Sequence, residues 1–493
     1  MTRYLALLTF LVFCCGTHPF SLLAPAGAQP IRTLLITGKN NHNWRYTSRV
    51  HADTLEATGR FDVTITDDPA RDLASPGMLA RHQLIVLDYN AEERWPEDIE
   101  KAFSDHIRRG CGLVSIHASN NAFRGWEDYE RMHALMWRKG ETTHGKFHEF
   151  TVEFVDRDHP IVKGIADFTT PDELYHNMVN PHGAEYTLLA RAMSSTESGG
   201  SGKYEPMALT RTWGQGRVFA TPLGHTWEKQ DATKVSVVNP GFRALLVRGA
   251  EWAATGKVTL DPQWSDTRPH NALTPEEQAA GWTLLFDGST TAGWHAWRQE
   301  GFPKAGWSVQ GGTLCFTPGN GGGDIATDAD YADFELSIEW KVGPGGNSGI
   351  MYRAAEGHDY PWRTGREFQV LDDLRHVDGK KPKTRAGCMY DLFALAHDTA
   401  RPAGEWNHAR IVAVGTRIEH WLNGFKVVDI DTASPAYAEA MKNSKFATMP
   451  GFGEPTTGRI TLQDHGDPVW YRNIKLRRLG PGTGAAPARE ASE

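Results

Sequence analysis

The sequence is poor in cysteine: only five occur among 493 residues. Two of them, Cys14 and Cys15, lie in an N-terminal apolar segment, which leaves Cys111, Cys315 and Cys388 in the rest of the chain. Cys315 and Cys388 lie in the same half and are one conceivable pair. An odd number of cysteines without a local pairing pattern nevertheless argues against a fold held together by disulfides.

The sequence also lacks any block of basic residues. Its 52 Lys and Arg residues are outnumbered by 60 Asp and Glu residues, giving a formal net charge of −8. Since nucleic acids and anionic membranes are bound through clustered cations, we expect neither as a partner. The 17 Trp and 50 Gly residues suit β-rich domains with many turns; most of the Trp residues are expected in cores, although indole faces also suit stacking on sugar rings. We expect a small-molecule or oligosaccharide substrate, and the oligomeric state remains open.

Long apolar runs are absent after the N-terminus. The run from Tyr4 to Cys15 follows Arg3, is too short for a stable membrane span, and precedes a small-residue cleavage pattern at Ala26-Gly27-Ala28. We therefore interpret residues 1–28 as a signal peptide and expect a periplasmic or secreted bacterial protein without a membrane anchor. Residues 480–493, rich in Gly, Ala and Pro, are expected to be disordered.

Residues 31–256 alternate apolar strand patterns with helical patterns. Strands are expected at 31–37, 61–66, 82–88 and 112–117, and helices at 46–58, 97–109 and 241–255. Near-continuous apolar strands separated by helices predict a parallel sheet covered on both faces. Sites in such folds lie at the carboxyl ends of the strands, so we expect His42, His117 and His225, each just past a strand, to converge in a cleft.

Three imidazoles, with Glu173 as a fourth ligand, are a donor set that suits Zn²⁺ or another borderline cation. Their spacing is dispersed rather than compact, so a hydrogen-bonded polar cleft without metal is an equally open interpretation. His144 and His148, four residues apart, are interpreted as part of an exposed loop.

The N-terminal half resembles the trehalose-utilisation (ThuA-like) family. The resemblance is carried by Asn41-His42, Gly112 to Ala118, His159-Pro160-Ile161, Asp172 to Tyr175 and Gly216 to His225. It implies a flavodoxin-like fold similar to class I glutamine amidotransferases. Those enzymes place a cysteine at a strand-to-helix elbow, where this chain has His117, so we expect no thiol nucleophile.

The pattern of apolar and polar residues changes after residue 256. Residues 257–280 are rich in turn formers and lack periodicity, which indicates a linker. From 281 to 479 the chain shows short β patterns, among them an alternating run at 334–342, with hairpin signals at Gly311-Gly312 and Asn423-Gly424. The absence of a long helical pattern there predicts an all-β, two-sheet (jelly-roll) sandwich.

One strand of this half, Gly365 to Asp372, carries alternating apolar and polar residues. Phe368 and Val370 are expected to face a core, whereas Glu367 and Gln369 face outward into a groove. Asp372 is out of phase by one residue. We expect a bulge after Val370 to return Asp372 to the Glu367 face.

The C-terminal half resembles the 3-keto-disaccharide hydrolase family, whose fold is a concanavalin-like sandwich. The residues that carry the resemblance are Leu285 to Gly288, Gly293-Trp294, Tyr331 to Leu336, Asn347 to Ile350, Glu367 to Asp372, Gly404 to Asn407, His420 to Gly424, Gly458 to Gly466 and Arg472 to Ile474. Glu367 to Asp372 is also similar to the catalytic strand of laminarinase-type glycosidases. Gln369 at its centre alters the carboxylate pair, which argues against ordinary retaining hydrolysis.

The resemblance implies a 3-keto-glycoside as substrate. A ketone at C3 acidifies the C2 proton, so a base can remove it, the C1 group can leave by β-elimination, and water can add. We assign Glu367 as the base, His465 as the acid or enolate donor, and Arg353 as the group that holds the enolate charge. Sugar contacts are expected from Gln369, Asp372, Gln463, Asn347 and Trp362.

Three alternatives stay open at this point. Asp372, Asp464 and His465 are a second candidate cation site, for Zn²⁺ or Ca²⁺ as the electrophile. The sandwich is alternatively a carbohydrate-binding module attached to a catalytic ThuA-like domain. The third alternative is a glycosidase that acts on unoxidised glucans.

Overall fold

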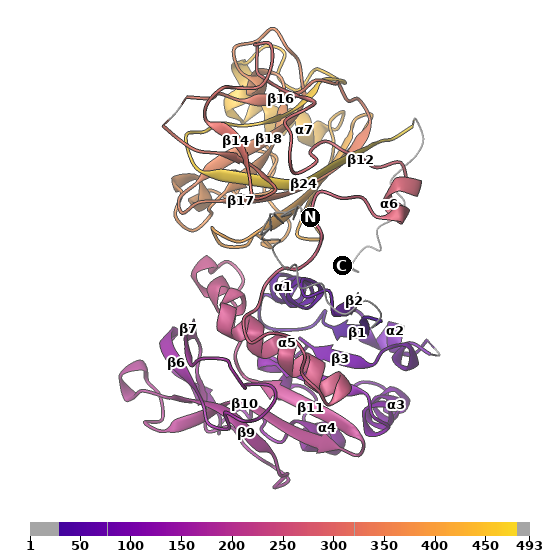
Figure 1. Ribbon diagram of the computed structural model, residues 1–493, viewed down its shortest axis with the longest axis vertical. Coiled ribbons are helices and arrows are strands. Elements are labelled where there is room, and N and C mark those ends of the chain that lie inside the picture. The colour runs from indigo at the N-terminus through magenta and orange to yellow at the C-terminus, as the bar shows by residue number, and fades with distance from the viewer. Residues whose placement is uncertain (1–28, 76, 320, 481–493) are drawn as a thin grey trace, which may run out of the picture.

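The computed structural model describes residues 29–75, 77–319 and 321–480. The expected signal peptide (1–28) and residues 481–493 of the expected tail lie outside the described residues. The described chain forms two lobes stacked along the long axis, an α/β lobe in indigo to magenta and a β-sandwich in orange and yellow (Figure 1). The predicted fold class is confirmed. In the described part of the chain, no helix has the length and apolar character needed to cross a membrane.

The α/β lobe contains a nine-stranded sheet in the order β2-β1-β3-β4-β11-β10-β9-β6-β7. The strands are β1 (Ile31–Ile36), β2 (Phe61–Thr66), β3 (Leu84–Leu87), β4 (Gly112–Ile116), β6 (His148–Phe154), β7 (Phe168–Asp172), β9 (Thr187–Met193), β10 (Tyr204–Trp213) and β11 (Gly216–Thr221). The first five in the sheet pair in parallel. The remaining four form an antiparallel extension that the sequence patterns did not predict.

Helices cover both faces of this sheet, as predicted. They are α1 (Trp44–Glu56), α2 (Pro69–Leu73), α3 (Glu97–Arg108), α4 (Glu127–His133) and α5 (Pro240–Thr255), and a separate hairpin pairs β5 (Thr143–His144) with β8 (Tyr175–His176). Alternate residues of β1 enter two different cores: Leu35 packs with α1 and α5, whereas Leu34 and Ile36 pack with α3 and α4. This two-sided burial is why the parallel strands are apolar throughout.

The C-terminal lobe is a sandwich of two antiparallel sheets. The larger has the order β14-β15-β24-β17-β20-β21-β22 with β12 paired to β24, and the smaller has the order β13-β16-β23-β18-β19. The strands are β12 (Thr283–Leu284), β13 (Trp294–Ala296), β14 (Trp307–Gln310), β15 (Thr313–Phe316), β16 (Ile325–Thr327), β17 (Phe334–Val342), β18 (Asn347–Ala354), β19 (Arg366–Leu371), β20 (Asn407–Val414), β21 (Arg417–Leu422), β22 (Phe425–Asp431), β23 (Arg459–Leu462) and β24 (Val469–Arg478).

The alternation predicted for β17 produces the centre of the sandwich core. Phe334, Leu336, Ile338 and Trp340 are all fully buried between the sheets. Of two short helices, α6 (Pro275–Ala279) has no buried residue, whereas α7 (Pro435–Lys442) packs Tyr437 and Ala440 against the sandwich core. The short 3-10 helices are η1 (Leu79–Arg81), η2 (His117–Asn121), η3 (Thr196–Ser198), η4 (Asp231–Val238), η5 (Pro361–Arg363), η6 (Val377–Lys380) and η7 (Lys445–Thr448).

The three described cysteines, Cys111, Cys315 and Cys388, are buried and free. Both cores therefore form without a disulfide among the described residues. Residues 257–280 lie against the α/β lobe as well as between the lobes, since Trp264 Nε1 donates to the Thr54 carbonyl oxygen at 3.0 Å.

Buried charges join the two lobes. Lys234 of η4 is 2% exposed, and its Nζ lies 2.8 Å from Asp231 Oδ1 and 2.6 Å from Asp398 Oδ1 of the sandwich. Arg385 of the sandwich also forms an ion pair with Asp231, at 3.0 Å. A cation so fully removed from water is stable only while its partners remain in place.

We expect Lys234→Met to lower the free energy of unfolding by about 3–5 kcal/mol, because Asp231 and Asp398 would then share a dry interface with too little positive charge. Urea denaturation followed by tryptophan fluorescence measures the loss. Lys101→Met is the control, since Lys101 pairs with Asp105 on the surface and its loss should cost about 0.3–0.5 kcal/mol. Equal effects of the two variants would contradict the prediction.

Candidate functional site

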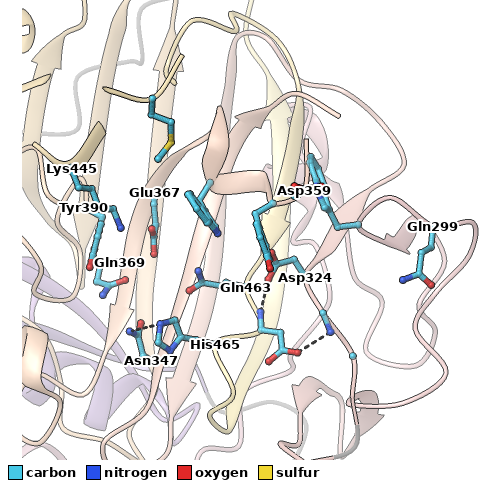
Figure 2. A pocket seen from close by; sticks show the side chains of 17 residues that line it. Gln299, Asp324, Asn347, Asp359, Glu367, Gln369, Tyr390, Lys445, Gln463 and His465 are labelled. Carbon is cyan, nitrogen blue, oxygen red and sulfur yellow. Dashed lines mark hydrogen bonds between the residues drawn. The ribbon is translucent and has the colours of Figure 1, made fainter. Parts of the chain in front are cut away.

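A cavity of about 820 Å³ opens on the smaller sheet of the sandwich. Figure 2 shows its lining side chains, with Glu367, Gln369 and Gln463 extending toward the open space. The residues that line it are Trp297, Gln299, Gly322, Gly323, Asp324, Asn347, Asp359, Tyr360, Trp362, Glu367, Gln369, Tyr390, Lys445, Met449, Gln463, Asp464 and His465.

Strand β19 supplies the floor of the cavity by the alternation its sequence predicts. Phe368 and Val370 are fully buried in the sandwich core. Glu367 and Gln369 point to the opposite face, line the cavity, and are 8% and 1% exposed. The strand therefore holds a carboxyl and an amide on a rigid, hydrogen-bonded element.

The neighbouring strand β18 leaves room for the carboxyl. Gly349 is the register partner of Gln369, and a Cβ added at Gly349 would lie 2.3 Å from Glu367 Oε1. Any side chain at that position would have to displace the carboxyl group. Gln369 fixes the same oxygen when its amide is oriented so that both of its polar atoms are satisfied: the nitrogen then donates to Glu367 Oε1 at 2.9 Å and to the Ser348 carbonyl oxygen at 3.0 Å.

Burial raises the pKa of Glu367 to about 8, because the carboxylate form loses its hydration. The Lys445 ammonium opposes this shift and the Asp324 carboxyl adds to it. Asp324 is itself shifted, since burial raises its pKa to about 7 while the Asp464 backbone N–H, 2.9 Å away, lowers it. The cavity thus holds two carboxyl groups that exchange protons near neutral pH.

The other wall of the cavity carries His465, Asn347 and Gln463. Asn347 Nδ2 lies 3.4 Å from His465 Nε2, and His465 Nδ1 lies 3.9 Å from Asp467 Oδ2. Asn347 Oδ1 and Gln463 Oε1 are buried without a hydrogen-bond partner among the described residues. Buried acceptors of this kind normally have donors, and hydroxyl groups of a ligand in the cavity are suitable ones.

The cavity brings together six of the eight residues predicted for it: Glu367, His465, Gln369, Gln463, Asn347 and Trp362. It also contains residues that no motif identified, chiefly Lys445 of η7, Tyr390 and Asp324. Lys445 Nζ lies 4.1 Å from the centroid of the Tyr390 ring. A lone lysine at the start of a short 3-10 helix carries no periodic signal, so only the fold reveals its position.

Arg353 does not lie in the cavity, which corrects its predicted placement beside the substrate. Its φ is +52°, and the pairing of β18 with β23 shifts register between Met351 and Ala354. The guanidinium donates to the Ala332 and Gly415 carbonyl oxygens, each at 2.8 Å. It also pairs with Asp333 at 3.2 Å, so its donors are committed to neighbouring loops and not to the cavity.

Asp372 is also misplaced by the sequence interpretation. The pairing of β18 with β19 runs without a register shift to Leu371, so no bulge follows Val370. The Asp372 carboxylate instead accepts from the Gly345 backbone N–H at 2.7 Å and pairs with Arg375 at 3.3 Å. The predicted cation site of Asp372, Asp464 and His465 is therefore not assembled.

A second cluster lies at the carboxyl ends of the parallel strands in the α/β lobe. His42, His117 and His225 offer nitrogen atoms that all lie within 4.8 Å of one another. His117 Nε2 lies 3.4 Å from His42 Nε2 and 3.3 Å from His225 Nδ1, and Glu173 Oε2 lies 3.1 Å from His225 Nδ1. The structure thus brings these four residues together, as the sequence predicted.

Burial keeps these imidazoles neutral. It lowers the pKa of His42 to about 2 and that of His117 to about 4, and it lowers the pKa of His225 further. Burial raises the pKa of Glu173. His144, expected in an exposed loop, lies at the edge of this cluster with Nδ1 3.3 Å from Glu173 Oε2.

Comparison with known proteins assigns each of the two lobes to a protein family. Residues 281–477 match the 3-keto-alpha-glucoside-1,2-lyase-like domain family, and residues 32–253 match the trehalose utilisation family. The chain is 34% identical over 231 residues to a 3-keto-disaccharide hydrolase of Bacteroides thetaiotaomicron, covering 41% of this chain and 79% of that protein.

Solved structures match each lobe separately. A "putative glycosyl hydrolase" from Parabacteroides distasonis is 32% identical, covers 43% of this chain and 100% of its own, and has a TM-score of 0.41. A "putative thua-like protein" from Parabacteroides merdae is 36% identical, covers 47% of this chain and 93% of its own, and has a TM-score of 0.43.

The cavity of the sandwich is thus lined by acidic, amide and aromatic side chains in a domain whose relatives are hydrolases of sugars. The chain belongs to the 3-keto-alpha-glucoside-1,2-lyase-like family through residues 281–477, joined to a trehalose utilisation domain at residues 32–253, and it is a glycosidase-type enzyme of carbohydrate metabolism.

Proposed function

We propose that the sandwich cleaves 3-keto-glycosides by elimination at C1–C2 followed by addition of water. The observation that carries this proposal is the Glu367 carboxyl, buried at the floor of a sugar-sized cavity with a pKa raised to about 8. A base whose pKa lies near the working pH is suited to removing a carbon-bound proton. The name of the Bacteroides relative supports the oxidised sugar as the substrate class.

In the first step Glu367 takes the C2 proton, and the electron pair of the C2–H bond moves into an enolate at C2, C3 and the C3 oxygen. That pair then forms the C1–C2 double bond as the bond from C1 to the leaving oxygen breaks. Gln369 holds Oε1 of Glu367 and so directs proton transfer to a fixed position in the cavity. Water subsequently adds across the double bond and releases the 3-keto-sugar.

Lys445 replaces Arg353 in the role of stabilising the enolate. Its ammonium group lines the cavity and is the strongest favourable charge for ionised Glu367. His465, whose side chain is 46% exposed, lies toward the mouth and donates a ring N–H to the departing oxygen. A leaving group at the mouth can differ in size without a change in the floor.

Hydroxyl groups of the sugar satisfy the free acceptors of the cavity, Asn347 Oδ1 and Gln463 Oε1. Trp362 stacks on Tyr360 with ring centroids 5.3 Å apart and supplies an aromatic wall. Export to the periplasm or medium is part of the same proposal and rests on the pattern of residues 1–28.

The full chain should convert a 3-keto-glucoside and leave the matched unoxidised glucoside intact, because only the ketone acidifies C2. Glu367→Gln should lower kcat at least about 1,000-fold, near the upper end of what one general base supplies. Product release measured by chromatography checks both. Equal rates on the two substrates would favour a glucan glycosidase, and binding without turnover would favour a carbohydrate-binding module.

The value of kcat/KM should rise with pH to a plateau above about pH 8, since Glu367 acts as a base only when ionised. Lys445→Met removes the charge that stabilises the carboxylate, so the midpoint of this rise should move upward by about 0.5 unit or more. Lys445→Arg should keep the wild-type midpoint. Lys442→Met, at the exposed end of α7, is the control. A fall of kcat/KM with pH would instead assign Glu367 as the acid.

Gly349→Ala should displace the Glu367 carboxyl, because the added Cβ needs the space that Oε1 occupies. We expect kcat/KM to fall about 100-fold, the cost of misplacing a reacting group by about 1 Å. Gly343→Ala is the matched control, since its nearest neighbour would lie 3.5 Å away. Unchanged kinetics of Gly349→Ala, measured alongside near-ultraviolet circular dichroism to verify folding, would contradict this account of the floor.

A further inference from the structure

We propose that His42, His117, His225 and Glu173 bind one divalent transition-metal ion, of which Zn²⁺ fits the donor set best. The site lies in the α/β lobe and is separate from the sandwich cavity. Among the described residues, His42, His117 and His225 are the group whose ligand atoms converge closely enough to hold an ion, and Glu173 contacts His225 at the edge of that group.

Three of the distances in the cluster are close to those between the ligands of a tetrahedral ion. Zn–N bonds of about 2.0–2.1 Å place neighbouring ligand atoms roughly 3.3–3.4 Å apart in a tetrahedron. His117 Nε2 lies 3.4 Å from His42 Nε2 and 3.3 Å from His225 Nδ1. Glu173 Oε2, 3.1 Å from His225 Nδ1, offers the fourth ligand. Nitrogen and carboxylate donors of this kind suit borderline cations.

The hydrogen bonds around the cluster orient two lone pairs toward each other. His42 Nδ1 faces Asn40 Oδ1 at 2.9 Å, and His117 Nδ1 faces the Pro222 carbonyl oxygen at 2.7 Å. Both partners accept, so both Nδ1 atoms carry the proton and both Nε2 atoms carry a lone pair. Two such lone pairs 3.4 Å apart repel each other unless a cation lies between them. Outer contacts that fix the tautomer are typical of metal-binding histidines.

Further contacts hold the remaining ligands in place. Asp172 accepts from the backbone N–H groups of Gly224 and His225, at 2.8 and 3.1 Å, and so fixes the loop that carries His225. Trp227 Nε1 lies 3.3 Å from Glu173 Oε1, which leaves Oε2 turned toward the histidines. The cluster is thus preorganised by side chains that are not themselves ligands.

A hydrogen-bonded cluster without metal is the competing arrangement. Tyr175 Oη lies 2.9 Å from His117 Nε2 and can donate a proton to its lone pair, and His225 Nδ1 can donate to Glu173. This arrangement leaves the lone pair of His42 without a donor. The two arrangements differ in the expected effect of Tyr175→Phe. In the cluster without metal the substitution removes a hydrogen bond that His117 needs. In the metal site it removes a group that competes with the ion for the lone pair of His117.

The test uses the full chain, from which bound metal is first removed with a chelator. Zn²⁺ binding is then measured by calorimetry, and Co²⁺ binding by visible absorption. We expect one ion per chain and an absorption band typical of four-coordinate Co²⁺. His42→Ala, at the more exposed side of the cluster, and His117→Ala should each weaken binding at least about 100-fold. Tyr175→Phe should bind at least as tightly as the wild type.

His148→Ala is the matched control, because His148 lies on β6 of the same lobe and contacts the Lys146 carbonyl oxygen rather than the cluster. Should His117→Ala fail to fold, His42→Ala alone decides the question. Wild-type binding no tighter than that of His42→Ala, or weakened binding in Tyr175→Phe, would overturn the proposal. Because the readout is metal affinity, its outcome is independent of whether the sandwich cleaves a 3-keto-glycoside.

Discussion

The burial of the Glu367 carboxyl is the constraint on which the sandwich cavity depends. Placing this group on a strand between a core and a cavity removes its hydration, and the same loss of water that costs stability raises its basicity. The fold accommodates it by two local features: Gly349 has no side chain to occupy the space, and Gln369 donates to Oε1. Neither neighbour neutralises the group, so its proton affinity stays high. Active sites commonly combine desolvation with fixed polar contacts in this manner.

The sequence predicts those parts of the molecule that follow from a repeating pattern. Alternation along β17 and β19 correctly separates core from outer face, since both strands lie on one hydrophobic core. Strand ends followed by histidine predict the cluster in the α/β lobe because the ends of parallel strands meet at one edge. The predicted position of Asp372 was wrong because periodicity does not determine whether a strand bulges or simply ends. Arg353 was misplaced for a similar reason, a register shift that only the neighbouring strand reveals. Lys445 reaches the cavity from the short helix η7 and Asp324 from the loop before β16, and no short pattern specifies either position.

The two lobes are joined by charged groups rather than by a purely apolar surface. Lys234 and Asp231 belong to η4, which follows the loop of His225 and Trp227, whereas Asp398 and Arg385 belong to the long loop after β19. Arg385 also lies 3.4 Å from Asp373, next to the end of the strand that carries Glu367. Burial raises the pKa of Asp373 to about 7. A connected set of largely buried ion pairs thus runs from η4, which follows the His225 loop, to Asp373 beside the strand of Glu367. Breaking one member exposes the others to an unbalanced charge, so the relative position of the lobes is firmly specified.

Desolvation acts on both the Glu367 cavity and the histidine cluster, and it shifts their pKa values in opposite directions. An acid that loses water holds its proton more tightly, so Glu367 becomes a stronger base in its ionised form. A base that loses water gives up its proton more readily, so His42 and His117 stay neutral across the physiological range. Neutral imidazoles that rarely accept a proton are poor general acids, but their lone pairs are free to bind a cation. Acid–base catalysis therefore fits the sandwich, where carboxyl groups titrate near neutrality. The α/β lobe is better suited to holding a positive charge that its side chains do not themselves supply.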